Sequence, residues 1–437
     1  MPMPETKALA GSSPRGRYTR RIVDDELDEL IAGLPAIALE GPKAVGKTAT
    51  ALQRAATVYR LDDEAERSIA QADPSRLIRG ERPVLIDEWQ RLPEVFDRVR
   101  RAVDESAPPG SFLLTGSASP IDPPTHSGAG RIVQVRLRPM TLAERGFDPP
   151  TVSLRALLDG KRPPVDGQTS VDLEDYVKEI LASGFPGLRG LPERLARAQL
   201  DGYIDRIIDR DFDELGRKVR RPATLRSWMQ AYAAATSTTT SYEKIRDAAT
   251  SGHGDKPSRA TTQPYRDILE RLWILDPVPA WLPTRSRLAR LSAPPKHHLA
   301  DPALAARLLG ADATTLLHPS GTAAPITREG TLLGALFESL VTLCVRVYAQ
   351  AAEARTSHLR TWSGDREIDL IVERGHKVLA VEAKLGHTPD ERDVRHLNWL
   401  RDELGAELAD AIIITTGTTA YRRADGIAVI PAVLLGP

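Results

Sequence analysis

The chain has 437 residues, 41% of them hydrophobic and 27% charged, which is the composition of a folded globular protein with more than one domain. Its 59 basic and 59 acidic residues cancel, so net charge gives no argument for a chain devoted to binding nucleic acid or membranes. The single cysteine, Cys344, excludes an internal disulfide framework and favours a cytoplasmic location, and because no apolar run reaches about 18 residues, we expect no membrane span.

A phosphate-binding loop (P-loop) is predicted at residues 41–48, where the sequence is GPKAVGKT. The pattern is G-x-x-x-x-G-K-[ST], in which glycines let backbone N–H groups surround phosphate, Lys47 reaches the β and γ oxygens and Thr48 holds Mg²⁺. An apolar strand at 37–39 precedes the loop and a helical pattern at 48–56 follows it, as this motif requires. We therefore expect ATP and Mg²⁺ as cofactors. The predicted nucleotide-binding residues are Gly41, Pro42, Lys43, Ala44, Val45, Gly46, Lys47 and Thr48.

An acidic motif follows, where the apolar strand at 82–86 ends in Asp87 and Glu88. This is a Walker B pattern. Asp87 is expected to complete the Mg²⁺ shell of the nucleotide opposite Thr48, and Glu88 to orient and deprotonate the attacking water. The alternative is a solvated strand end, but the P-loop upstream favours a paired function.

Two further strands complete the predicted nucleotide domain. The strand at 112–117 ends in hydroxyl groups, and between the P-loop strand and the Asp-Glu strand it would place Thr115 or Ser117 beside the γ-phosphate. The strand at 131–137 begins with Arg131, which is interpreted either as an arginine finger or as a surface arginine. A finger could act in its own site or in that of a neighbour, and the second case would imply a homo-oligomer.

Together these motifs resemble the prokaryotic AAA_14 family of AAA+-type ATPases. The residues that carry the resemblance are the P-loop, 84–88 with the following WQRLP, 114–117, and 131–144. Members of that family usually continue into a DUF4143 region, so the resemblance covers about residues 18–437. Trp89 departs from the pattern, since the family more often has an aliphatic residue there. The resemblance implies an ATP hydrolase of the additional-strand AAA+ type.

The middle of the chain is expected to be helical. Residues 148–170 are rich in proline and polar residues and are predicted to be a linker between an ATPase domain at 18–147 and a helical region at 171–325. Three helical patterns, at 225–236, 242–249 and 261–275, with short strands at 275–279 and 288–291, outline a winged helix. Its charge is mixed, so either a nucleic acid or a protein could be its partner.

The last third, residues 326–437, contains a second group of candidate catalytic residues. A long helix carries Glu338, and the two strands of a predicted hairpin carry Asp369 and the pair Glu382-x-Lys384. Strand alternation puts Glu382 and Lys384 on one face. Acids in this arrangement can hold Mg²⁺ and a lysine can activate water, as in the PD-(D/E)XK nuclease fold that this region resembles. The alternative is a salt-bridged hairpin in a degenerate domain of that fold. The candidate metal ligands are thus Thr48 and Asp87 in the ATPase domain, and Glu338, Asp369 and Glu382 here.

The expected fold class is α/β, with a P-loop NTPase domain, a helical winged-helix middle and a C-terminal α/β nuclease-like domain. The sequence favours a cytoplasmic AAA+-type ATPase whose hydrolysis drives or gates the back half of the chain. One alternative is a nucleotide-dependent binding switch with little turnover. Another is a metal-dependent nuclease that ATP licenses.

Overall fold

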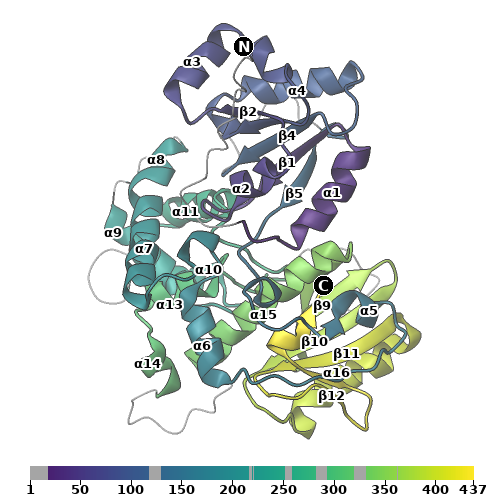
Figure 1. The fold of residues 1–437 in the computed structure, drawn as a ribbon. Coiled ribbons are helices and arrows are strands. Elements are labelled where there is room, and N and C mark those ends of the chain that lie inside the picture. Colours follow the sequence, from purple (N-terminus) through teal and green to yellow (C-terminus); the bar gives the residue numbers. More distant parts are fainter. Residues whose placement is uncertain are drawn as a thin grey trace, which may run out of the picture.

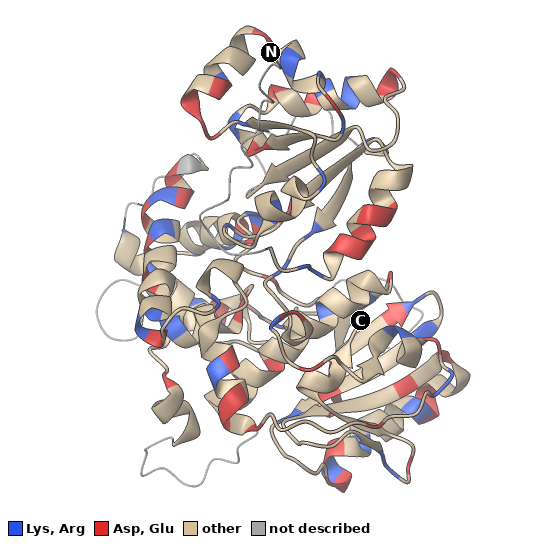
Figure 2. Cartoon of the chain, in the orientation of Figure 1, with Lys and Arg blue, Asp and Glu red and all other residues tan. Residues whose placement is uncertain are grey.

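The computed structural model describes residues 18–117, 129–215, 219, 221–250, 258–281, 293–318, 331–361 and 363–437. Figure 1 shows an α/β region at the top, a group of helices at the left, and a second α/β region at the lower right. Acidic and basic residues are interspersed over all three regions (Figure 2), as the balanced composition predicts.

A five-stranded parallel sheet forms the centre of the N-terminal region, in the order β2-β3-β4-β1-β5. β4, the fourth strand along the chain, lies between the P-loop strand β1 and the acidic strand β3, so the predicted additional-strand order is confirmed. The strands are β1 (Ala36–Glu40), β2 (Thr57–Arg60), β3 (Val84–Asp87), β4 (Phe112–Gly116) and β5 (Val133–Arg136). The three inner strands, β3, β4 and β1, are almost continuous apolar runs because helices cover both faces, whereas the edge strands β2 and β5 are partly exposed.

Alternate residues of these strands enter two different cores. Ile37 and Leu39 of β1 pack with α1 (Val23–Gly33) and α2 (Lys47–Leu52) on one face of the sheet. Ala36 and Ala38, which alternate with them along β1, belong to the core on the other face, with α3 (Glu64–Ala72) and α4 (Glu94–Asp104). This α/β sandwich fixes the P-loop, which connects β1 to α2, at the carboxyl edge of the sheet.

The middle region is helical, as expected. The three helices predicted around the winged helix are present as α9 (Pro222–Ala234), α10 (Tyr242–Ala248) and α11 (Arg259–Arg271). Around 275–279 the chain forms isolated bridges from Leu275 to Leu299 and from Val278 to Lys296, and the predicted strand at 288–291 lies outside the described residues. The winged helix therefore stays a prediction. The other helices are α6 (Leu173–Ala182), α7 (Glu193–Arg206), the π-helix η5 (Ile207–Asp211), α8 (Phe212–Glu214), α13 (Pro302–Leu308) and α14 (Ala313–Leu317).

A seven-stranded mixed sheet forms the C-terminal region, in the order β12-β13-β11-β10-β9-β8-β7. The helix α15 (Leu332–Ala351) packs on one face of this sheet and α16 (Glu391–Leu404) on the other. The edge strand β7 lies at 280–281, within the stretch 171–325 that was predicted to be a separate helical region. The strands are β7 (Ala280–Trp281), β8 (Arg355–Arg360), β9 (Glu367–Arg374), β10 (Lys377–Lys384), β11 (Leu408–Thr415), β12 (Tyr421–Arg422) and β13 (Ala428–Pro431).

Residues 148–170 do not behave as the linker that their composition predicts. They contain β6 (Val152–Ser153), which pairs in parallel with β14 (Leu435–Gly436), and α5 (Leu154–Leu158). The leucines of α5 are buried against β10, β11 and α15. Although the segment is rich in proline, its short apolar helix α5 anchors it to the C-terminal sheet.

The helix α15 corrects the expectation that no apolar run is long enough to span a membrane. Within the described part of the chain it is the one helix whose length and composition would allow a span, and 67% of its apolar window is buried inside the fold. It carries Glu338 and Arg346, and both form ion pairs with other parts of the protein. We therefore interpret α15 as the core helix of the C-terminal region.

Candidate functional site

The P-loop has the backbone geometry that its two glycines permit. Gly41 has φ 151°, and a Cβ atom there would lie 2.2 Å from the carbonyl oxygen of Leu137, so no other residue fits without moving the backbone. Gly46 has φ 105°, in the region that favours glycine, and α2 begins at the next residue. The loop is thereby folded tightly between β1 and α2.

Lys47 is buried at the centre of this loop. Its Nζ atom donates hydrogen bonds to the carbonyl oxygens of Gly41 and Pro42, both at 2.8 Å. Burial lowers the pKa of Lys47 to about 8, although the negative charges of Glu88 and Asp87 oppose the shift. The ammonium group is therefore held inside the loop, at the point where a bound phosphate would meet it.

Two hydroxyl groups converge on Asp87 at the end of β3. Thr48 Oγ1 donates to Asp87 Oδ1 at 2.7 Å, and Thr115 Oγ1 donates to the same oxygen at 2.5 Å. The carboxylate and Thr115 are buried. Hydroxyl and carboxylate oxygens are the hard ligands that Mg²⁺ takes from proteins, so Thr48 and Asp87 fit the predicted metal. Thr115 lies beside this pair.

Glu88 is held in an unusual conformation next to that pair. Its backbone has φ 54°, a left-handed conformation that costs a residue with a side chain about 1–3 kcal/mol and tends to occur at functional sites. Its Oε2 atom accepts a hydrogen bond from Gln90 Nε2 at 2.5 Å and one from Ser117 Oγ at 3.3 Å. Ser117 therefore positions Glu88, whereas Thr115 contacts Asp87. Gln90 was not among the predicted site residues, although its place just after the acidic motif was a usable signal.

Arg131 lies far from the P-loop within its own chain. It precedes β5, and β5 runs parallel to β1, so Arg131 is at the amino edge of the sheet while the P-loop is at the carboxyl edge. Its Nε atom lies 2.9 Å from Asp104 Oδ1 at the end of α4. An arginine finger acting in its own site does not fit this geometry. A finger acting in a neighbouring chain stays a prediction.

The P-loop also contacts the helical region, which no local motif indicated. Lys43 Nζ lies 2.6 Å from Asp211 Oδ1 in the π-helix η5, and Tyr203 donates its hydroxyl hydrogen to the carbonyl oxygen of Lys43 at 3.3 Å. π-Helical turns are rare in proteins, and those that occur are often located at functional sites. The P-loop is thus physically joined to the second third of the chain.

The predicted C-terminal residues do come together. Glu338 of α15, Asp369 of β9, and Glu382 and Lys384 of β10 all line one cavity of about 630 Å³. Lys384 Nζ lies 3.3 Å from Glu382 Oε1, as the shared strand face predicts. Burial and, to a smaller extent, repulsion from Asp369 raise the pKa of Glu338 to about 8.

A lysine that the sequence analysis did not consider stands among these acids. Lys296 Nζ lies 2.9 Å from Glu338 Oε1 and 2.9 Å from Asp369 Oδ1. Burial lowers the pKa of Lys296, but the charges of Asp369, Glu338 and Glu367 outweigh it and raise the pKa well above its ordinary value. Over the described ranges, no group of three or more His, Cys, Asp or Glu residues is arranged to hold a metal ion.

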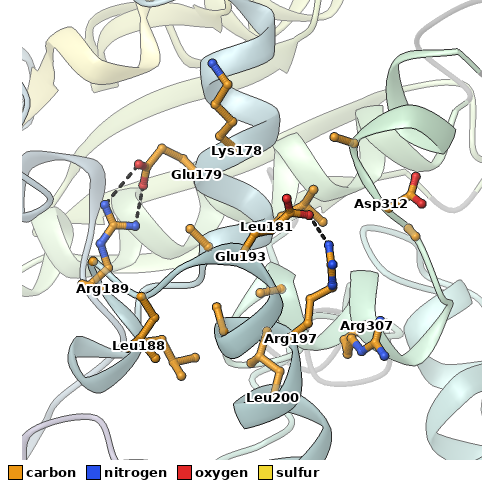
Figure 3. Close-up of a pocket in the computed structure, with 17 residues that line it drawn as sticks. Lys178, Glu179, Leu181, Leu188, Arg189, Glu193, Arg197, Leu200, Arg307 and Asp312 are labelled. Atoms are coloured by element: carbon orange, nitrogen blue, oxygen red, sulfur yellow. Dashed lines mark hydrogen bonds and ion pairs between the residues drawn. The ribbon is translucent and has the colours of Figure 1, made fainter.

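A second cavity, of about 300 Å³, lies among α6, α7, α13 and α14 and contains none of the predicted site residues. Its walls are largely apolar, with Leu188 and Leu200 among them, and Figure 3 shows charged side chains at its margin. Most of those charges are paired within the protein: Arg189 with Glu179, Arg197 with Glu193, Arg307 with Asp201, and Lys178 with Asp175. Asp312 also lines the cavity, and its carboxylate accepts hydrogen bonds from the backbone N–H and the hydroxyl group of Thr315.

Comparison with protein families confirms the resemblance seen in the sequence at both ends of the chain. Residues 34–145 match the family AAA_14, described as an AAA domain, and residues 333–435 match DUF4143, described as a domain of unknown function. Residues 173–315 match DUF8612, also a domain of unknown function. The N-terminal region is therefore an AAA-type domain with a P-loop NTPase-like fold. The nuclease-like character of the C-terminal region stays a prediction.

Two curated relatives are similar along almost the whole chain. They are the uncharacterized proteins Mb2031c of Mycobacterium bovis and Rv2008c of Mycobacterium tuberculosis, each 26% identical over 434 residues, which cover 96% of this chain and 86% of each relative. Among solved structures, the Walker-type ATPase PABY2304 of Pyrococcus abyssi is similar with a TM-score of 0.38 and 17% identity, over 65% of this chain and 94% of that chain.

Proposed function

We propose that this chain is an ATPase that binds ATP and Mg²⁺ in the P-loop of its AAA-type domain, and whose hydrolysis gates the helical and C-terminal regions. The observation that carries the proposal is the convergence of Thr48 and Thr115 on one oxygen of Asp87, beside the P-loop. A P-loop hydroxyl and a Walker B carboxylate are the two protein ligands that P-loop NTPases give to Mg²⁺. The family match over residues 34–145 supports the same assignment.

Each residue of the proposed site has one task. Lys47 would neutralise charge on the β and γ oxygens of the nucleotide. Thr48 and Asp87 would hold Mg²⁺, which when bound draws charge from the transferred phosphoryl group. Glu88, whose carboxylate is fixed by its neighbours, would orient the attacking water and accept its proton.

The contacts of the P-loop with its surroundings support the gating part of the proposal. Arg21 is buried, and its Nη1 atom donates to the carbonyl oxygen of Val45 at 3.1 Å while its Nε atom lies 2.9 Å from Glu144 Oε1. On the other side of the loop, Lys43 pairs with Asp211 of the helical region. A change in the loop during hydrolysis would therefore reach other parts of the chain through charged contacts.

Steady-state turnover of ATP by the purified full chain tests this proposal. With Mg²⁺ present we expect release of phosphate, which stops when EDTA removes the metal. DNA and RNA are added in separate assays, and stimulation by either identifies a nucleic acid as the partner of the helical region. Tight ATP binding without turnover in every assay would contradict an ATPase and favour the nucleotide-dependent switch. Cleavage of nucleic acid that requires ATP would favour the ATP-licensed nuclease.

A further inference from the structure

The centre of the C-terminal acidic group is filled by the side chain of Lys296. Its ammonium nitrogen lies 2.9 Å from one oxygen of Glu338, 2.9 Å from one oxygen of Asp369 and 3.5 Å from one oxygen of Glu367. The lysine side chain is only 1% exposed. A divalent ion shared by Glu338 and Asp369 would need to lie within about 2.0–2.6 Å of their oxygens, in the space that the ammonium group fills.

Three further oxygens of the predicted metal ligands, on Asp369 and Glu382, also have partners within the protein. Asp369 Oδ2 accepts a hydrogen bond from the backbone N–H of Ala383 at 2.9 Å. Glu382 Oε1 lies 3.3 Å from Lys384 Nζ, and Glu382 Oε2 accepts from the backbone N–H of Asp369 at 3.4 Å. A metal ion would therefore have to displace several existing interactions as well as the lysine.

Lys296 is fixed in this position by its backbone. Its N–H donates to the carbonyl oxygen of Val278, and its carbonyl oxygen accepts from the N–H of Val278, both at 2.9 Å. The next residue, His297, donates its backbone N–H to the carbonyl oxygen of Thr238 at 2.8 Å. The lysine thus enters the acidic group from a segment that is itself attached to the helical region.

We infer that Lys296 supplies the positive charge that a divalent cation would supply in a PD-(D/E)XK-like site, so that the C-terminal site of the natural chain binds neither Mg²⁺ nor Mn²⁺. The predicted ligands are brought together, but their charges are balanced by a residue of the same chain. Buried acids without a cation would be destabilising, and the lysine removes that cost while connecting the helical region to the C-terminal sheet. This inference does not depend on whether the AAA-type domain hydrolyses ATP.

Replacing Lys296 by an uncharged residue of similar length tests the inference. Thermal unfolding of the full chain is followed with and without millimolar Mn²⁺, for the natural chain and for Lys296→Met. We expect Mn²⁺ to raise the Tm of Lys296→Met by several degrees more than that of the natural chain, because the acids that lose their lysine partner then gain a cation. The extra shift should disappear in Lys296→Met combined with Asp369→Asn, which locates the new site.

Lys377→Met is the matched control, since it removes a lysine from the same strand as Lys384 without touching the acids. It should respond to Mn²⁺ as the natural chain does. A folded Lys296→Met protein that gains no Mn²⁺ response would overturn the inference. If Lys296→Met does not fold at all, calorimetric titration of the natural chain and of Asp369→Asn with Mn²⁺ decides: binding that depends on Asp369 overturns the inference, and identical titrations support it.

Discussion

Lys43 in the P-loop and Asp211 in the π-helix η5 form an ion pair in which Nζ and Oδ1 are 2.6 Å apart. The carboxylate is almost completely buried, at 3% exposure, so its charge is weakly screened. A bound nucleotide brings several negative charges to the same loop. The two anions would therefore compete for Lys43, and nucleotide binding would weaken the connection between the ATP site and the helical region.

Asp211→Asn should consequently bind ATP more tightly than the natural chain. Removal of one nearby negative charge is worth on the order of 1 kcal/mol, or about fivefold in Kd. Titration with a fluorescent ATP analogue measures the change. Asp209→Asn is the matched control, because Asp209 lies in the same π-helix but is exposed, and its Kd should stay unchanged. Equal or weaker binding by Asp211→Asn would exclude competition for Lys43.

Substitutions in the two nucleotide motifs should separate binding from hydrolysis. Lys47→Ala removes the cation that faces the phosphates and should abolish ATP binding. Glu88→Gln removes only the base and should bind ATP normally while turnover falls by about 10²–10⁴-fold. Glu94→Gln, an exposed carboxylate of α4, serves as the control for a general effect of charge. Unchanged turnover in Glu88→Gln would remove Glu88 from the mechanism.

ATP affinity should fall as the pH rises above about 8. Burial lowers the pKa of Lys47 to about 8 in the free protein, and the phosphates of bound ATP would raise it again, because anions favour the protonated form. Above this pH the free protein must take up a proton in order to bind, so affinity should drop by up to about tenfold per pH unit. Calorimetric titrations at pH 7, 8 and 9 measure both the affinity and the proton uptake. Constant affinity across this range would contradict the prediction, and Lys47→Arg, which stays charged, should show no such trend.

Asp276 should be a major contributor to the stability of the fold. Its carboxylate lies 3.2 Å from Arg136, 2.9 Å from Arg138 and 3.0 Å from Arg346, and so connects the ATPase sheet, the helical region and α15. Burial alone would raise the pKa of Asp276, but the three guanidinium groups outweigh it and hold the pKa well below its ordinary range. Asp276→Asn leaves these buried cations without their counter-charge, which should lower the free energy of unfolding by about 3–5 kcal/mol.

Urea unfolding at pH 7 measures this loss. Asp25→Asn is the control, since Asp25 pairs with Arg20 on the surface and its replacement should leave the free energy of unfolding almost unchanged. Because the folded pKa of Asp276 is depressed, its contribution is complete above the unfolded pKa of about 4 and is lost as the pH falls through the folded value. Asp276→Asn should therefore differ from the natural chain at pH 7 and approach it in strong acid. Equal stability at pH 7 would contradict the prediction.

The geometry of the candidate nucleotide site could be predicted from the sequence because its residues occupy contiguous motifs. Gly41, Lys47 and Thr48 lie in one loop, and Asp87 directly ends a buried strand, so local patterns bring each side chain to the carboxyl edge of the sheet. Arg131 shows the limit of the same reasoning. The number of residues between Arg131 and the P-loop does not show at which edge of the sheet Arg131 lies. Only the parallel pairing of β5 with β1 shows that Arg131, which precedes β5, lies at the edge opposite the P-loop.

Long-range partners were beyond the reach of local patterns. Asp211 is 168 positions from Lys43, and Lys296 is 73 positions from Asp369, with no feature of either sequence neighbourhood that indicates the contact. The helix α5 was missed for a different reason. Its few apolar residues are surrounded by prolines and polar residues, and composition averaged over that segment predicts a linker although the leucines are fully buried.

The pairing of β6 with β14 has a consequence for co-translational folding. Ser153 Oγ donates to the carbonyl oxygen of Pro437, 284 positions further along the chain. The leucines of α5 likewise leave the ribosome long before α15, β10 and β11, against which they are buried, have been made. The ATPase sheet, which is complete at β5, can fold first, since domains of a growing chain fold in order from the N-terminus. A nascent chain can thus have a folded nucleotide-binding region while the apolar side chains of α5 are still exposed to water or bound by a chaperone.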